Sequence, residues 1–99
     1  MVFTIFARQE YESAEALERA RPFLLAHRRR CLDSEPGTLQ LDFSRDNEND
    51  RVLMLYEAYV DRPAFDAHWT GESITRLRAE FEAQGIRFQG KGTRCTLLE

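Results

Sequence analysis

The 99-residue sequence lacks any apolar run close to the roughly 20 residues that a membrane-spanning helix needs, so we expect no membrane partner. It also lacks an excess of positive charge. The formal net charge is −3, whereas surfaces that bind nucleic acids are basic, so we expect no nucleic-acid partner either. The first residues, MVFTIFARQ, lack the basic start and long apolar core of a signal peptide, which favours a cytoplasmic location.

Cysteine and histidine are both scarce, with two of each in the chain. Cys31 and Cys95 form no CxxC pair and no metal-ligand spacing, so we interpret both as reduced, small apolar residues. His27 and His68 have no third ligand nearby in the sequence, and two ligands make a poor metal site. The sequence therefore predicts no metal centre.

Apolar periodicity predicts four strands and two helical regions in a single domain, residues 1–99. The order is β-α-β-β-α-β, which is the split βαβ arrangement of ferredoxin-like folds. Asp61 is a good N-cap for the second helical region. The strands are expected over residues 2–8, 39–44, 52–60 and 86–98, with a polar connection over 9–12 and a polar turn over 46–50.

Several local signals mark the ends and irregularities of these elements. Ser13 can cap the first helix, and Ser73 can cap a new turn after a break in the second helical region. Pro22 leaves two possibilities open: one kinked helix, or a short piece followed by a main helix. Gly90 and Gly92 suggest a bulge or a bend in the last strand.

The predicted fold class is α+β, a four-stranded antiparallel sheet with the helices on one face. The other face would then be bare. Yet the strands over 2–8 and 52–60 carry apolar residues on both sides. Because an exposed apolar patch of that size marks an interface, we expect a homodimer with the bare sheets face to face.

The stretch over residues 52–69 has the most pocket-like composition in the chain. Glu57 is the one charge inside an apolar strand, and a buried carboxylate must be paired, wetted by a pocket or protonated. Phe65, His68 and Trp69 follow on one face of a helix, at spacings of three and four residues. A lone acid, a histidine and two large aromatics therefore converge here.

Adjacent strand residues point to opposite faces, so Tyr56 and Glu57 compete for a place on the pocket wall. Each candidate also has a structural interpretation. Glu57 would be a buried partner for an arginine or for backbone N–H groups, and His68 a helix histidine bonded to the sheet edge. The two aromatics would be core residues. His27, in a stripe with apolar neighbours, would be a satisfied core histidine.

The segments EPGTLQ (35–40), YEAY (56–59) and AFDAH (64–68), with Asp61 between the last two, resemble the antibiotic biosynthesis monooxygenase (ABM) domain. The resemblance covers most of the chain. It implies a dimeric α/β barrel with a pocket between sheet and helices in each protomer. For characterised relatives it also implies oxidation of quinol- or anthrone-like aromatics by O₂ with neither metal nor flavin.

Two groups of similar domains fit this sequence less well. Haem-degrading relatives have an asparagine in the first strand and a haem-ligating histidine late in the second helical region. Neither is present, because the first strand has no asparagine and no histidine follows Trp69. Isomerases of small phosphorylated sugars often have a second histidine a few residues beyond the one that matches His68, where Ser73 stands.

The resemblance thus favours a cofactor-independent monooxygenase that acts on a small hydrophobic or aromatic molecule with O₂. The alternatives are an isomerase with a histidine base and a non-catalytic small-molecule-binding module. Cofactor-free oxygenation needs a base and an apolar, aromatic-lined cavity for an electron-rich anion. His68 and Glu57 are the candidate catalytic residues. The candidate substrate-binding residues are Phe65, Trp69, Tyr56, Tyr59, His27 and Leu77.

Overall fold

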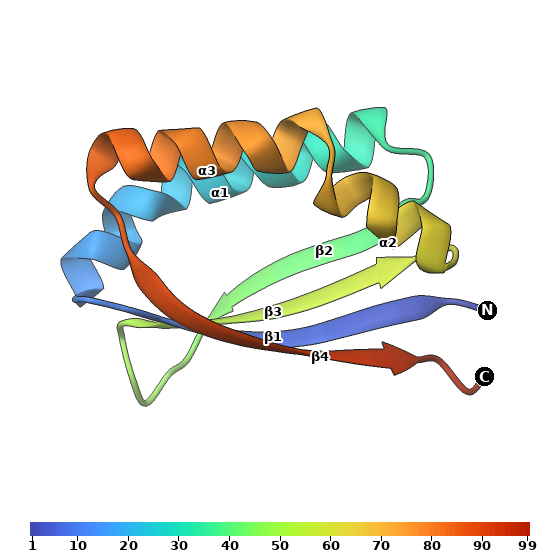
Figure 1. Ribbon diagram of the computed structural model, residues 1–99. Coiled ribbons are helices and arrows are strands. Elements are labelled where there is room, and N and C mark those ends of the chain that lie inside the picture. The colour runs from blue at the N-terminus through green and yellow to red at the C-terminus, as the bar shows by residue number, and fades with distance from the viewer.

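The computed structural model of residues 1–99 contains a four-stranded sheet and three helices (Figure 1). The strand order is β2-β3-β1-β4, and every neighbouring pair is antiparallel. This confirms the ferredoxin-like α+β class, with the second helical region divided into two helices. In chain order the elements are β1 (Phe3–Tyr11), α1 (Ala14–Ser34), β2 (Thr38–Arg45), β3 (Val52–Tyr59), α2 (Arg62–Trp69), α3 (Glu72–Gln84) and β4 (Phe88–Thr96).

All three helices lie on one side of the sheet, as Figure 1 shows. The long helices α1 and α3 run side by side, and the short α2 covers the sheet near the chain termini. The opposite face of the sheet carries no helix. No helix in the structure combines the length and the apolar character needed to cross a membrane.

Helix α1 is continuous through Pro22, which resolves the question left open by the sequence. Ser13 caps it as predicted, and its Oγ accepts a hydrogen bond from the Ala16 N–H at 3.0 Å. Pro22 is exposed, so the helix carbonyl that its missing N–H leaves unbonded faces solvent. The predicted apolar stripe is buried along this helix, from Leu17 to Cys31.

Three predicted details are wrong. Strand β1 continues to Tyr11 through the expected polar connection, because Gln9 and Glu10 pair with strands on both sides and Tyr11 pairs with Phe88 of β4. Ser73 does not cap α3: Gly71 occupies the N-cap, and the Ser73 side chain bonds His27 and Arg30 instead. Strand β4 pairs with β1 without a register shift, so of the predicted bulge or bend the bulge is absent there. The sheet's irregularity lies in β2, between Thr38 and Gln40.

The core between sheet and helices consists of two clusters. The larger lies under α1 and α3 and includes Leu24, Leu77 and Phe81. The smaller lies under α2 and includes Ile5 and Phe65. Residues of both clusters line one cavity, so this cavity sits where the two clusters meet. The cavity is lined by residues of both α2 and α3, the two helices into which the second helical region is divided.

Candidate functional site

The cavity between the two core clusters has a volume of about 370 Å³, within the usual range for small-molecule sites. Its floor comes from β1 and β3, its walls from α2 and α3, and its rim from β4. Most of its lining is apolar. The lining residues are Ile5, Ala7, Gln9, Leu24, Leu55, Glu57, Phe65, Trp69, Ile74, Leu77, Arg78, Phe81, Phe88, Gly90, Lys91, Gly92 and Arg94.

The register of the sheet decides which side of β3 faces this cavity. Glu57 is paired with Ile5 of β1, and both side chains lie on the helix-covered face. Tyr56 points to the bare face, where its ring packs against Phe6 with a centroid separation of 5.0 Å. Glu57 therefore lines the cavity, and Tyr56 lies outside it.

Glu57 supplies the one carboxylate on the cavity wall. The hydroxyl of Tyr59, two residues along the same strand face, donates a 2.5 Å hydrogen bond to Glu57 Oε1. Burial raises the pKa of the Glu57 carboxyl above its usual value, while the Tyr59 hydrogen bond and nearby His68 oppose this rise. Burial also raises the pKa of Tyr59 far above its usual range, so its hydroxyl stays a donor. The result is a positioned carboxyl group with strengthened basicity.

Aromatic rings form the α2 side of the cavity. Phe65 and Trp69 are stacked, with ring centroids 6.0 Å apart and planes 22° from parallel. The Arg78 guanidinium lies 4.6 Å from the Trp69 ring centroid, and that of Arg94 lies 5.2 Å from the Phe65 ring centroid. Trp69 remains 50% exposed, so it lies at the mouth of the cavity and not in the core. The mouth is thus both aromatic and cationic.

His68 does not line this cavity. It is buried, and its Nδ1 lies 2.8 Å from Glu35 Oε1, at the wall of a separate polar groove of about 500 Å³. Burial acts to raise the pKa of Glu35, but the hydrogen bonds from His68 and Thr38 outweigh it and lower the pKa. On its other side the His68 ring packs against Tyr59, with centroids 5.3 Å apart. His68 therefore reaches the cavity only through Tyr59.

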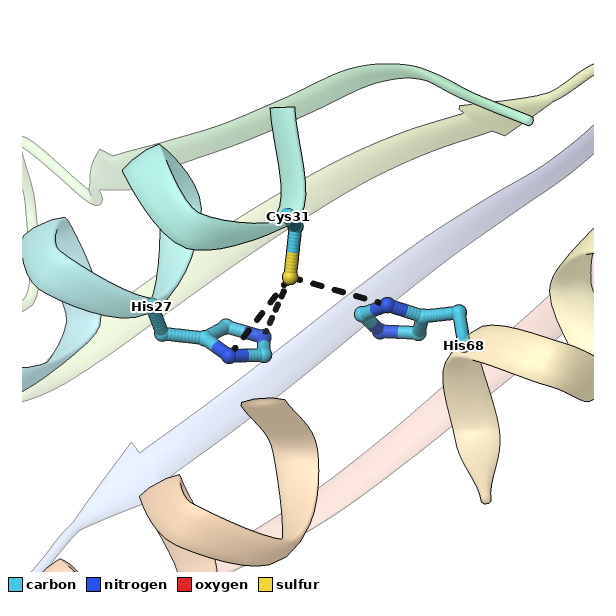
Figure 2. Close-up of side chains that lie close together, drawn as sticks. All are labelled: His27, Cys31 and His68. Carbon is cyan, nitrogen blue, oxygen red and sulfur yellow. Dashed lines mark hydrogen bonds between the residues drawn. The ribbon is translucent and has the colours of Figure 1, made fainter. Parts of the chain in front are cut away.

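His27 also lies away from the cavity, in contact with Cys31 and Ser73 (Figure 2). Its Nδ1 lies 2.9 Å from Ser73 Oγ. Burial, with smaller contributions from nearby His68 and Arg30, lowers the pKa of His27 to about 4. Burial likewise raises the pKa of the Cys31 thiol to about 12. Both side chains are therefore uncharged at neutral pH.

The sequence matches the model of one protein family, described as antibiotic biosynthesis monooxygenase, over residues 12–80. That match spans more than half of the chain. The chain belongs to the antibiotic biosynthesis monooxygenase (ABM) family. No curated protein matches the sequence.

Solved structures share the ABM fold with this chain over nearly its full length. One is a candidate antibiotic biosynthesis monooxygenase from Bacteroides thetaiotaomicron, with 18% identity, a TM-score of 0.84, and coverage of 99% of this chain and 90% of that one. A Mycobacterium tuberculosis protein has 21% identity, a TM-score of 0.81, and coverage of 100% and 97%. A Pseudomonas aeruginosa protein has 27% identity, a TM-score of 0.76, and coverage of 99% and 95%.

The predicted site residues of this ABM chain divide into two groups. Those on the cavity wall are Glu57, Phe65, Trp69 and Leu77. Those away from it are His68, Tyr59, His27 and Tyr56. Tyr59 is completely buried and acts on the cavity through its bond to the carboxylate.

The sequence predicts a charged rim of Arg8, Arg76 and Arg78 near the pocket, and of these three only Arg78 lines the cavity. Two residues were not predicted. Arg94 reaches the cavity mouth from β4, and nothing local in the sequence marks it for this place. The other is Cys31, which lies between His27 and His68. Cys31 is the third ligand that His27 and His68 lack when only their neighbours in the sequence are considered. The spacing of four residues from His27 to Cys31 on one helix face was the available signal.

Proposed function

We propose that this ABM chain is a cofactor-independent monooxygenase that oxidises a small hydroxylated aromatic with O₂ inside the cavity. One observation carries the proposal: the carboxyl group of Glu57 is the one carboxylate on a mostly apolar cavity wall, and the Tyr59 hydroxyl holds it. A base with raised pKa can take a proton from a phenol or an activated C–H group near neutral pH. In this proposal Glu57 is the base.

The proposed reaction draws all its electrons from the substrate. Glu57 takes a proton, and the aromatic anion passes one electron to O₂. The two radicals then combine through a C–O bond to give a peroxide anion, which recovers the proton from Glu57. Loss of water from this peroxide, with the hydrogen on the same carbon, leaves a carbonyl group. One oxygen atom of O₂ thus enters the product and the other leaves as water.

The cavity walls suit such a substrate. The stacked rings of Phe65 and Trp69 offer an aromatic surface on which a planar molecule can lie. The guanidinium groups of Arg78 and Arg94 at the mouth favour a bound anion over its neutral form. An apolar interior keeps water away from that anion and admits O₂.

His68 has a positioning role in this proposal. It packs on the ring of Tyr59, whose hydroxyl holds Glu57, and it is itself held by Glu35. A change at His68 should therefore alter the orientation of the base without removing it. We expect His68→Gln to lower the rate less than Glu57→Gln.

The test is O₂ uptake by the purified protein with 1,4-hydroquinones, anthrone and hydroxylated naphthalenes, and with no cofactor added. We expect uptake above autoxidation in the wild type and a loss of about 10²–10⁴-fold in Glu57→Gln, the range typical for a general base. The matched control is Glu10→Gln, because Glu10 lies on a strand but outside the cavity and bonds only arginines. Equal rates in Glu57→Gln and wild type would refute the role of Glu57.

A binding measurement separates catalysis from sequestration. Trp69 is the one tryptophan of the chain and stands at the cavity mouth, so its fluorescence reports occupancy. Quenching by the panel compounds together with O₂ uptake supports the proposal. Quenching without uptake would overturn it in favour of a binding module, or of an isomerase if solvent deuterium enters the ligand without O₂. Absence of quenching would overturn the aromatic substrate class.

We further propose that the bare sheet face is covered by a second copy of the chain. Phe6 is 53% exposed and Met54 42% exposed on that face, with Tyr56 beside them. Polar residues surround this apolar centre, as at a typical interface with a polar rim. Light scattering at micromolar concentration should give twice the chain mass, and a monomer would refute this. A cytoplasmic location stays a prediction.

A further inference from the structure

The side chains of His27, Cys31 and His68 meet in the interior of the protein, at a place that the cavity does not reach. All three are buried, with 2%, 0% and 4% of their surfaces exposed. Two come from one face of α1 and the third from α2, so segments far apart in sequence build the cluster (Figure 2). Their candidate ligand atoms lie within 4.8 Å of one another.

We propose that His27, Cys31 and His68 form a binding site for a borderline-soft divalent metal ion such as Zn²⁺, with Glu35 as the fourth ligand. One thiolate, two imidazoles and one carboxylate are all groups that Zn²⁺ binds in tetrahedral sites. The charges of the thiolate and the carboxylate would balance the charge of the ion. The proposal does not rest on the oxygenase function, since no residue of the trio lines the cavity.

The distances already approach those of a tetrahedral site. With Zn–S bonds of about 2.3 Å and Zn–N bonds of about 2.0 Å at tetrahedral angles, sulfur and nitrogen lie about 3.5 Å apart. Cys31 Sγ lies 3.6 Å from His27 Nε2 and 3.7 Å from His68 Nδ1. The two imidazole nitrogens should lie about 3.3 Å apart, so they must approach by at most about 1.5 Å from their limit of 4.8 Å. Binding of an ion would therefore require the two rings to move toward each other.

Neighbouring polar groups already orient the proposed ligands. Ser73 Oγ lies 2.9 Å from His27 Nδ1, which leaves Nε2 as the ring nitrogen available to an ion. Cys31 Sγ lies 3.6 Å from Nε2 and 3.7 Å from Nδ1, so the His27 ring must rotate to point Nε2 at the same ion as Cys31. A hydrogen bond to the second ring nitrogen, like that with Ser73, is the usual support of a metal-bound histidine. Arg30 also donates to Ser73 Oγ, at 3.0 Å, and thereby holds the hydroxyl in place. Arg30 brings a positive charge near the site, and Glu80 lies 4.0 Å from its guanidinium to balance it.

The Glu35 carboxylate can exchange its hydrogen bond with His68 for a bond to the metal ion. Its Oε1 now accepts from His68 Nδ1 at 2.8 Å and from Thr38 Oγ1 at 2.7 Å. When the ion takes the lone pair of His68 Nδ1, that proton leaves and Glu35 Oε1 becomes free to bind the ion. Glu35 and His68 both line the polar groove of about 500 Å³, which gives the ion a path from solvent.

Occupation of this site would join α1 to α2. Helix α2 is short and also carries Phe65 and Trp69, which form one side of the cavity. A ligand that binds only the folded protein stabilises it by mass action. We therefore expect Zn²⁺ to raise the Tm of the wild type and to leave that of Cys31→Ala unchanged.

The test is a Co²⁺ titration of the full, reduced chain after chelator treatment, with Zn²⁺ as the competitor. We expect one equivalent of Co²⁺ to give tetrahedral ligand-field bands and a thiolate-to-cobalt charge-transfer band, and Zn²⁺ to abolish both. The charge-transfer band should be lost in Cys31→Ala and kept in Cys95→Ser, which removes the half-buried thiol of β4. Absence of tetrahedral bands, or the same spectrum in Cys31→Ala, would overturn the proposal.

Two further measurements keep the proposal testable if a Cys31 variant fails to fold. X-ray absorption of the Zn²⁺-loaded wild type should show one sulfur neighbour at about 2.3 Å and nitrogen or oxygen neighbours at about 2.0 Å. A shell without sulfur would overturn it. Ser73→Ala should weaken Co²⁺ binding by about 10–100-fold, because Ser73 orients His27. Thr75→Ala, on the same helix but bonded to Gly71, should leave the affinity unchanged.

Discussion

Gly37 is the tightest point in the packing of α2 against the sheet. A Cβ atom built on Gly37 would lie 2.5 Å from the Cβ of Ala64 and 3.4 Å from Cγ2 of Val60. Ala64 lies in the first turn of α2, and the Gly37 carbonyl also accepts the Val60 N–H at 2.9 Å. Backbone hydrogen bonds fix both Gly37 and the first turn of α2, so the new methyl group can be accommodated only if α2 moves. We therefore expect Gly37→Ala to destabilise the protein.

The expected loss follows from two opposing effects. Overpacking of a close contact costs about 1–3 kcal/mol of folding free energy. A Gly-to-Ala change also restricts the unfolded chain, which returns about 0.4–1 kcal/mol. With the midpoints of these ranges, about 2 and about 0.7 kcal/mol, the net loss is about 1.3 kcal/mol, and at about 4–8 °C per kcal/mol for a chain of this size the Tm should fall by about 5–10 °C.

The assay is urea and thermal unfolding followed by circular dichroism, at one fixed protein concentration. Ala64→Gly opens the space that the new methyl group needs. In that background Gly37→Ala should cost at least about 1 kcal/mol less, which a double-mutant cycle measures as a coupling energy. Gly92→Ala is the matched control, because its Cβ would meet Ile5 and Ala7 at ordinary distances of 3.6 and 3.7 Å. A Gly37→Ala protein as stable as the wild type, or one with no coupling to Ala64, would refute this reasoning.

Three further predictions concern a cap, a carboxyl group and the bare sheet face. Asp61→Ala removes the acceptor of the Ala64 N–H at 2.9 Å, so unfolding should show a loss of about 1 kcal/mol, and Asp61→Asn should not. Because the folded chain raises the pKa of Glu57, wild-type stability should fall as pH rises from the unfolded pKa through the folded one. The Glu57→Gln variant should lack this fall. If urea unfolding from about pH 4 to 8 gives the same pH dependence of stability for the variant and the wild type, the prediction is wrong. Phe6→Glu should halve the mass found by light scattering, with the helix content intact; an unchanged dimer would place the interface elsewhere.

The elements of this fold could be predicted because their signals are local. Ser13 and Asp61 were predicted as N-caps, and the side chain of each accepts a hydrogen bond from the first turn of its helix. The spacing of apolar residues, which alternates in strands and recurs every three or four residues in helices, predicts the bounds of these elements to within a few residues of those in the structure. The predicted end of β1 is too early because Gln9 and Glu10 are polar in sequence and become part of a strand only by pairing with β3 and β4.

The candidate site could be predicted only in part. Residues 52–69 were expected to bring an acid and aromatics together, and Glu57, Phe65 and Trp69 do share the cavity wall. A strand with apolar residues on both sides does not reveal which side faces the helices, so the choice between Tyr56 and Glu57 needed the register of the sheet.

By itself the sequence determined the strands, the helices, the family and the stretch that forms the aromatic side of the cavity, because these depend on interactions between residues close in the chain. The tertiary structure alone decided three things. It turned Glu57 into the cavity, carried His68 away from it, and brought Cys31 between two histidines. Each depends on how separate elements pack, and a shift of one residue in a strand or one turn in a helix would change it.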